Sequence, residues 1–257
     1  MSSRLKKLFS SLVHGNQHER MKMLLLSLSF FLVIGSYTLV REIKSSIFMA
    51  VVGKDYVPWA RLIAMFILIP GVMFYSFLVD RLRRYQLLYF YSILYGVAGI
   101  FCTYLIAHPT VGLLNTDTSP YRLFGWFFYF FIEGFSPFVV SVFWAFANSV
   151  FTPNEARESY ALLVSGSKFG GMATAAAAWF IFSLRDAAGA PIFSNVVGHQ
   201  LVLALFTVLV FLIPIVIRIT IKKVPGQYLH GYEAVYQFEK HKKEQGQEKT
   251  GIFSGLV

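Results

Sequence analysis

The sequence has few charged residues, a single cysteine and none of the compact motifs that mark enzymes. Charged residues make up 14% of the chain, whereas soluble domains carry about 25%. Cys102 has no second cysteine to pair with, so an intramolecular disulfide is excluded. The sequence contains no phosphate-binding glycine loop, metal-ligand cluster or nucleophile triad. We therefore expect neither an enzyme nor a cofactor.

Long apolar stretches take the place of these features. Hydrophobic residues account for 56% of the chain, more than the core of a soluble protein of this size can bury. A transmembrane helix needs about 20 mostly apolar residues, and six segments meet that length. They lie at residues 23–50, 56–79, 85–107, 122–151, 160–184 and 199–219. The sequence predicts an all-α integral membrane protein, a bundle of six transmembrane helices.

The formal net charge is +10, and its distribution predicts the orientation. Most lysines and arginines fall in the two terminal segments and in the loops on the same side, which the positive-inside rule places in the cytoplasm. This placement indicates lipid headgroups, and not nucleic acid, as the anionic partner. We expect a cytoplasmic segment at 1–22 with a surface helix near 4–13, the bundle at 23–219 and a cytoplasmic linker at 220–257. The linker becomes apolar again at its end, so we expect it to lead to a second half.

Ionisable side chains inside the spans are the strongest indication of function. Such a group costs about 2.5–3.5 kcal/mol to insert, so it usually faces a cavity or a partner. Apart from residues at their ends, spans three and six contain none, which predicts that the other four helices line an aqueous path. The net positive charge of these groups favours an anionic solute. They are Arg41, Glu42, Lys44, Arg61, Glu133 and Lys168.

Two other interpretations of these charges remain open. Arg41, Lys44 and Arg61 lie toward one membrane surface, where long basic side chains also reach the headgroups. Glu133 and Lys168 lie deeper, and the alternative for them is a structural bridge between the two.

The fifth span carries a row of small residues at helical spacing. Small side chains three or four residues apart let two helix backbones approach closely within a membrane. We therefore expect a packing face for another helix at Gly166, Gly170, Ala173 and Ala177.

The turn between spans two and three resembles a motif of known transporters. Residues 80–84, D-R-L-R-R, resemble the conserved loop of major facilitator transporters. The resemblance implies that Asp80, Arg81, Arg83 and Arg84 act in conformational change. It also implies that this chain is the N-terminal half of a major facilitator-type fold.

A closer resemblance is to the ATP/ADP translocases, the nucleotide transporters of plastids and obligate intracellular bacteria. Residues 37–44, YTLVREIK, are similar to that family's Y-T-L-x-R-[DE]-x-K stretch, and residues 143–148, FWAFAN, match its F-W-G-F-A-N stretch. Further matches lie in the same order at residues 53–61, 133–136 and 155–160. In that family a lysine of helix one and a glutamate of helix four take part in nucleotide transport. The matching residues are Lys44 and Glu133.

The resemblance implies an antiporter that exchanges ATP, ADP or related nucleotides by alternating access, in a bacterial inner membrane. The substrate-binding residues that we expect are Arg41, Lys44, Arg61, Glu133, Asn148 and Lys168. A second six-helix half is expected to complete the transporter, without a metal or cofactor. Two alternatives remain: a transporter of another anionic or proton-coupled solute, and a half-length membrane scaffold that transports nothing.

Overall fold

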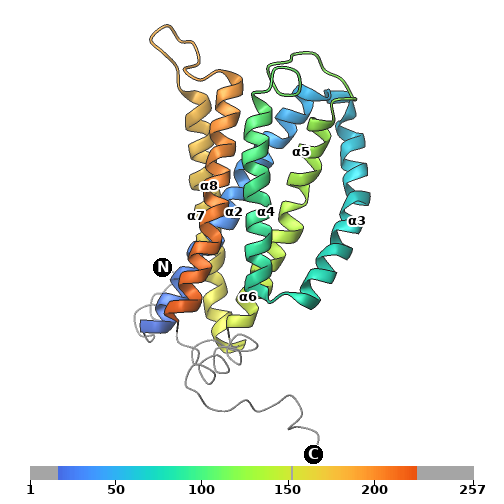
Figure 1. Ribbon diagram of the computed structural model, residues 1–257. Helices are drawn as coiled ribbons and strands as arrows, with labels where there is room; N and C mark the ends of the chain where they lie inside the picture. Colours follow the sequence, from blue (N-terminus) through green and yellow to red (C-terminus); the bar gives the residue numbers. More distant parts are fainter. Residues whose placement is uncertain (1–16, 152, 225–257) are drawn as a thin grey trace, which may run out of the picture.

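The structure is a computed structural model that describes residues 17–151 and 153–224, with side chains described outside 153–158. These residues form long helices with no β-strand among them (Figure 1), which confirms the all-α prediction. The predicted surface helix at 4–13 and most of the linker at 220–257 lie outside the described residues. The helices are α2 (Gln17–Val51), α3 (Val57–Arg81), α4 (Arg84–Ile106), α5 (Leu123–Glu133), α6 (Ser141–Val150), α7 (Pro153–Ser183) and α8 (Asn195–Lys223).

α5 and α6 form one rod, Leu123–Val150, and the π-helix η2 (Ser136–Val140) joins them. Pro137 explains the interruption between the two α-helices. Because proline has no N–H, the carbonyl of Glu133 loses the donor that a continuous α-helix would supply four residues later. The wider turn of the π-helix therefore begins shortly after Glu133, near the middle of the rod.

Five of the described helical segments are long and apolar enough to cross a membrane. They correspond to predicted spans one, two, three, four and six, and their ends lie close to the predicted limits. α7 contains predicted span five but is not among the five, although it is 31 residues long. Its sequence includes Lys168 with serines and glycines around it, which lower its apolarity. The membrane crossing of α7, and the predicted division of the chain into three regions, therefore stay predictions.

The first and last described helices have their chain ends at the same end of the bundle (Figure 1), as an even number of crossings requires. We call this the terminal end, and the opposite end, which holds the connections α2–α3, α4–α5 and α7–α8, the loop end. At the terminal end, only Leu82 and Arg83 join α3 to α4. At the loop end, α2 leads into α3 through Gly53 and a short 3-10 helix, η1 (Lys54–Tyr56). Gly53 has a φ of 120°, which other residues rarely adopt.

α2 crosses the middle of the bundle and packs closely against α7, which runs in the same direction. Two glycines of α7 make this approach. A Cβ added at Gly166 would lie 2.2 Å from Oγ of Ser27, and one at Gly170 would lie 2.3 Å from the carbonyl oxygen of Phe31. Both separations are well below van der Waals contact, so the two backbones pack this closely only because these residues are glycine.

The α2–α7 contact continues through Thr174, which is buried against Gly35. The prediction of a small-residue packing face is confirmed for Gly166 and Gly170. It is wrong for Ala173, which is exposed. The contact follows residues four apart along α7, namely Gly166, Gly170 and Thr174. Residues at this spacing form a ridge on the helix surface, and crossing helices commonly pack through such ridges.

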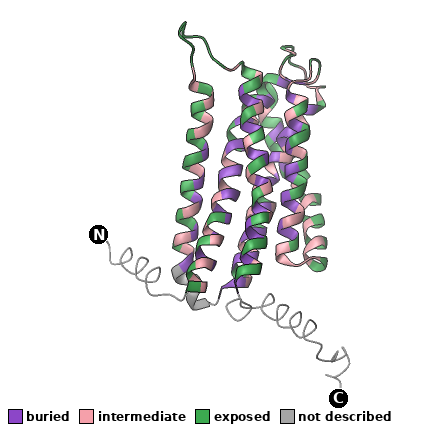
Figure 2. Cartoon of the chain, turned by 60° about the vertical axis from the view of Figure 1, so that its left-hand side comes forward, coloured by how far each residue is buried: buried purple, intermediate pink, exposed green. Residues whose placement is uncertain are grey.

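α3 lies at the edge of the bundle (Figure 1) and has little packing of its own. Within α3, which is described throughout, only Ala60 and Ala64 are buried. Large apolar side chains such as Phe66 and Met73 remain about 70% exposed. Elsewhere in the bundle, buried residues line the inner faces of the helices and exposed residues cover the outer faces (Figure 2).

Arg122, which precedes α5, organises the loop between α4 and α5. Its guanidinium donates hydrogen bonds, 2.5 to 3.4 Å long, to the carbonyl oxygens of Val51, Val111, Gly112, Asn115 and Asp117. The planar fork of an arginine can serve several acceptors at once. Arg122 therefore ties this loop and the start of α5 to the end of α2.

Candidate functional site

Lys44 of α2 and Glu133 of α5 form an ion pair between two helices that are far apart in the sequence. The Lys44 side chain is 12% exposed and the Glu133 side chain 37%. Lys44 lies seven residues before Val51, where α2 ends, which is about 10 Å from the loop end. The pair therefore holds two opposite charges within the bundle, and its carboxylate is the more accessible partner.

An aromatic ring of α5 helps to position Lys44. The ammonium of Lys44 lies 4.5 Å from the ring centre of Tyr129, which is one turn before Glu133. Tyr129 packs in turn against Phe48 of α2, with ring centres 5.0 Å apart. Because an aromatic face attracts a cation, Tyr129 stabilises the ammonium next to Glu133.

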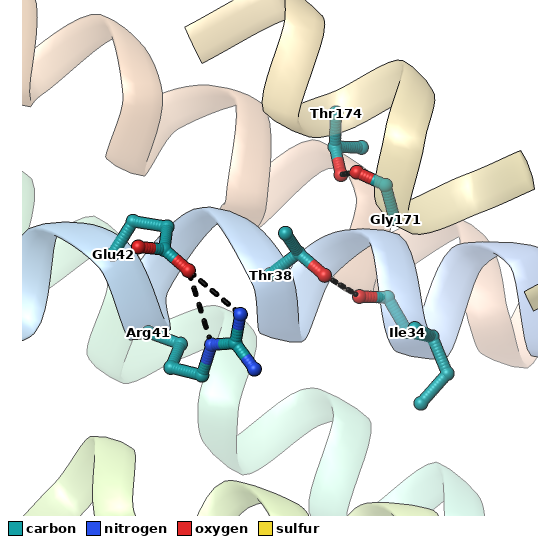
Figure 3. A network of polar contacts seen from close by, with 6 residues as sticks. All are labelled: Ile34, Thr38, Arg41, Glu42, Gly171 and Thr174. Atoms are coloured by element: carbon teal, nitrogen blue, oxygen red, sulfur yellow. Dashed lines mark hydrogen bonds and ion pairs between the residues drawn. The ribbon is translucent and has the colours of Figure 1, made fainter. Parts of the chain in front are cut away.

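Arg41 lies one turn before Lys44 on α2 and pairs with its neighbour Glu42 (Figure 3). Nε and Nη2 of Arg41 both donate to Oε1 of Glu42, at 3.1 and 2.7 Å. The Arg41 side chain is 55% exposed and that of Glu42 is 60% exposed. The helical rise places Arg41 about 4.5 Å from Lys44 along the axis. The site thus has two cations close together, each held by a carboxylate.

Two other predicted substrate residues lie away from this pair. Arg61 is exposed on α3 and makes no hydrogen bond or ion pair with the described residues. Asn148 lies near the end of α6, where its side-chain oxygen accepts a hydrogen bond from the hydroxyl of Tyr160. It follows Glu133 by fifteen residues, or about 22 Å along the rod. A role for Arg61 or Asn148 in substrate binding stays a prediction.

Lys168 is also distant from the pair. It is exposed on α7 and makes no ion pair within the described part of the chain. It lies two residues before Gly170, which faces Phe31 of α2, and Phe31 is about 20 Å along α2 from Lys44. The alternative of a structural bridge between Lys168 and Glu133 is wrong, because Glu133 pairs with Lys44. A role for Lys168 in substrate binding stays a prediction.

The paired charges define the chemistry that this site offers. Lys44 and Arg41 present N–H donors with positive charge, which bind phosphate oxygens by charge-assisted hydrogen bonds. Each of these cations is already paired with a carboxylate, so an incoming anion competes with that carboxylate. No group of three or more acidic, histidine or cysteine side chains that could hold a metal occurs within residues 17–151 and 153–224.

The chain matches the model of the TLC ATP/ADP transporter family over residues 1–256. It belongs to this family. The family consists of transporters and not of enzymes, so the predictions of a multi-pass integral membrane protein without catalytic activity are confirmed.

A curated relative, ADP,ATP carrier protein 3 of Rickettsia bellii, is 24% identical over 160 residues. The matched segment covers 54% of this chain and 31% of the relative, so the match spans about a third of that protein's length. No solved structure matches the chain. The resemblance to ATP/ADP translocases is therefore confirmed at the level of the family.

The predicted conformational loop of this TLC chain is the short turn at the terminal end. Arg81 is the last residue of α3, and its guanidinium lies 4.0 Å from the ring of the phenylalanine one turn earlier. The backbone N–H of Arg83 donates to the side-chain oxygen of Gln86, at 3.1 Å, and Arg84 begins α4. Asp80 is exposed and makes no ion pair with the described residues. A role for the loop in conformational change stays a prediction.

Sequence reasoning missed two polar residues that the structure places prominently. Arg122 has no signal beyond its position at the start of a span, because its carbonyl partners come from a loop without a recognisable motif. His199 had a weak signal, since it is the first residue of predicted span six, but it was counted as neutral. It is 5% exposed and lies where α2 and α8 meet.

Proposed function

We propose that this chain forms the nucleotide-binding half of a transporter that exchanges ATP, ADP or related nucleotides by alternating access. The observation that supports the proposal is the ion pair between Lys44 of α2 and Glu133 of α5. Without substrate, Glu133 neutralises Lys44 inside the bundle. Because Lys44 is largely shielded from water, losing its carboxylate partner is unfavourable, so the empty site keeps both charges in place.

Substrate binding then replaces one partner of Lys44 by another. Phosphate oxygens of the nucleotide bind Lys44 and displace Glu133, whose greater exposure lets its carboxylate turn to water. Arg41, which is exposed and one turn away, binds a second phosphate group with its planar fork. Because the Lys44–Glu133 contact joins α2 to α5, its opening loosens these two helices from each other.

Exchange follows from the cost of an unoccupied site. A carrier that changes its access without a bound nucleotide has two options. Lys44 and Glu133 stay paired and hold α2 to α5, or they separate and both charges lose their partner. The paired state holds the helices in one arrangement, and the separated state leaves charges without partners. Reorientation is therefore fast only with a nucleotide bound, which couples export of one nucleotide to import of another.

The second half of the transporter and the orientation of this chain in the membrane are also part of the proposal. We propose that a second six-helix half closes the chamber and that both ends of this chain lie in the cytoplasm of a bacterial cell, at its inner membrane. The name of the Rickettsia relative, ADP,ATP carrier protein 3, supports ADP and ATP as the first substrates to test.

Exchange in liposomes tests the assignment of the site. Liposomes that contain the whole gene product are loaded with ADP, and uptake of labelled ATP is measured from outside. We expect Lys44→Ala and Glu133→Ala to lower the exchange rate at least about tenfold, since a lost charge-assisted contact is worth about 1.4 kcal/mol or more. Lys54→Ala is the matched control, because Lys54 is an exposed lysine at the loop end. A wild-type rate in Lys44→Ala would contradict the proposal.

A double substitution separates folding from transport. Replacing Lys44 and Glu133 together, as Lys44→Met with Glu133→Leu, removes both charges and keeps similar volume, so stability changes little. Either substitution alone leaves one charge unpaired and lowers the unfolding midpoint. We expect the double variant to fold as the wild type does and to exchange no nucleotide. An active double variant would show that the pair serves only the fold.

A substrate comparison addresses the cargo. Competition of labelled ATP uptake by unlabelled ATP, ADP, NAD and simple organic phosphates ranks the ligands by affinity. We expect ATP and ADP to compete more strongly than the organic phosphates, because they present several phosphate groups to Arg41 and Lys44. Equal competition by a single phosphate group would favour a transporter of another anion.

A further inference from the structure

A second site lies between α2, α7 and α8, toward the loop end of the bundle. It is a pocket of about 440 Å³, at the lower end of the range of small-molecule sites. Its walls combine polar and aromatic side chains, among them Glu42, Ser46, Trp179, Phe182 and His199. Neither Lys44 nor Glu133 lines it, but Glu42, which pairs with Arg41, does, so the pocket adjoins the proposed nucleotide site.

His199 presents a hydrogen-bond acceptor toward α2. Its Nδ1 lies 2.7 Å from the carbonyl oxygen of Asn195, and a carbonyl only accepts, so Nδ1 carries the proton. In the neutral ring Nε2 is then an acceptor, and Oγ of Ser46 lies 3.4 Å from it. His199 is 5% exposed, so this acceptor is fixed at the edge of the pocket.

Glu42 presents a second acceptor, and it is charged. Both hydrogen bonds from Arg41 reach the same carboxylate oxygen, Oε1, and the other oxygen has no bond in the figure (Figure 3). Oε2 makes no hydrogen bond with any described residue. The pocket therefore contains a carboxylate oxygen that remains free to accept a hydrogen bond.

The aromatic walls complete the recognition chemistry. The ring of Phe182 lies 5.1 Å from the ring of His199, and the indole of Trp179 forms another side of the pocket. Aromatic faces attract cations, and organic ammonium ions are often bound by aromatic side chains together with a carboxylate. We propose that this pocket binds the ammonium group of a small amine or of a lipid headgroup, with Glu42 as its counter-ion.

Other classes of ligand fit these walls less well. An anion would be repelled by Glu42, and an apolar molecule would cover Oε2 of Glu42 without supplying a hydrogen-bond donor, which is costly. An ammonium group supplies an N–H donor to Oε2 of Glu42 and a positive charge to the aromatic faces. Because Glu42 also holds Arg41, the ammonium and Arg41 share one carboxylate.

Ethanolamine is the probe for this site. The full chain is placed in nanodiscs of phosphatidylglycerol, which lacks an ammonium group, and tryptophan fluorescence is recorded during titration. We expect a saturable change with ethanolamine and none with ethylene glycol, which has a hydroxyl in place of the ammonium. Trp179→Phe identifies the reporter, since it removes the change in signal from that position.

Substitutions in the pocket test the counter-ion. We expect Glu42→Gln to weaken ethanolamine binding at least about tenfold, because an ion pair becomes a neutral hydrogen bond. Glu19→Gln, at the other end of α2, is the matched control and leaves binding unchanged. Arg41→Gln releases Oε1 of Glu42 and should strengthen binding several-fold, a change that a purely structural role for Glu42 does not predict.

A second experiment, with phosphatidylethanolamine, distinguishes a lipid headgroup from a soluble amine as the source of the ammonium group. Nanodiscs that contain phosphatidylethanolamine are analysed by native mass spectrometry, which counts lipids retained by the protein. Retention that is lost in Glu42→Gln assigns the site to a headgroup, and binding of free ethanolamine without retention assigns it to a soluble amine. If neither is bound, or if Glu42→Gln behaves as the wild type in both arms, the proposal is wrong. No nucleotide is present, so this outcome is independent of the proposed transport function.

Discussion

α7 and α3 differ in how closely they pack: α7 lies in close backbone contact with α2, whereas α3 lies at the edge of the bundle and buries little. α7 packs its backbone onto α2 through Gly166 and Gly170. α3 buries only Ala60 and Ala64. In a membrane, where lipid competes for every apolar surface, such close packing is a main source of affinity between helices. The α2–α7 contact therefore behaves as a fixed unit, whereas α3 is the helix that moves most easily.

This difference bears on the proposed transport cycle. Elements with few buried contacts open at the lowest free energy, and a carrier that alternates its access needs such elements next to its site. The Lys44–Glu133 pair lies between α2, part of the fixed unit, and α5. Substitutions in the tightly packed and the loosely packed regions test this interpretation.

Of the substitutions at Gly170, Arg122 and Phe66, Gly170→Leu should produce the largest loss of stability. Its Cβ would meet the carbonyl oxygen of Phe31 at 2.3 Å, and backbone atoms cannot move aside as a flexible side chain does. We expect the free energy of unfolding to fall by about 3 kcal/mol, measured as the unfolding midpoint in detergent with increasing denaturant. Ala173→Leu, at an exposed position on the same helix, is the control and should unfold near the wild-type midpoint. Equal midpoints for the two variants would show that α2 and α7 do not pack as described.

Arg122→Met should cost less, about 2 kcal/mol. The variant keeps most of the side-chain volume and removes the donors to five carbonyl oxygens, which then depend on water. Because one of these carbonyls ends α2, the loss should also expose the α4–α5 loop to proteolysis. Limited proteolysis and the unfolding midpoint measure both effects. Arg185→Met in the α7–α8 loop, where the arginine side chain is exposed, should change neither.

Phe66→Ala should have the smallest effect. Phe66 on α3 is 69% exposed, so its truncation removes few protein contacts, and we expect a change within about 0.5 kcal/mol. Phe143→Ala is the comparison, because Phe143 is fully buried and stacks on Phe30 with ring centres 4.4 Å apart. Truncation there should cost about 3–5 kcal/mol. Similar losses for the two variants would mean that α3 is packed as tightly as the rest of the bundle.

The sequence predicted the helices well because hydropathy is a property of single segments. Runs of apolar residues gave limits close to those of α2 to α8, and the row at Gly166 and Gly170 predicted a packing face. The pair of Lys44 and Glu133 was harder to predict, since periodicity says nothing of contacts between helices far apart in the chain. Resemblance singled out each residue, and the structure showed that they touch.

Other features could not be predicted, for physical reasons that differ between them. The carbonyl oxygens around Arg122 belong to the backbone, so no residue type marks them. The ammonium pocket depends on three helices meeting, and Glu42 was predicted only as one of several charges in the first span. The π-helix has a visible cause in Pro137, but most prolines in membrane helices produce only a bend.

The two short connections of α3 restrict how that helix moves. Two residues tie its last turn to α4, and Gly53 with a single 3-10 turn ties its first turn to α2. Because both connections are short, α3 has little freedom to move along its own axis. The motion left to it is bending or tilting between its two fixed ends. Pro70, near the middle of α3, is the position where the helix bends most easily. Any bowing of α3 pulls on the end of α2 and the start of α4 together, so the two faces of the membrane are mechanically connected through it.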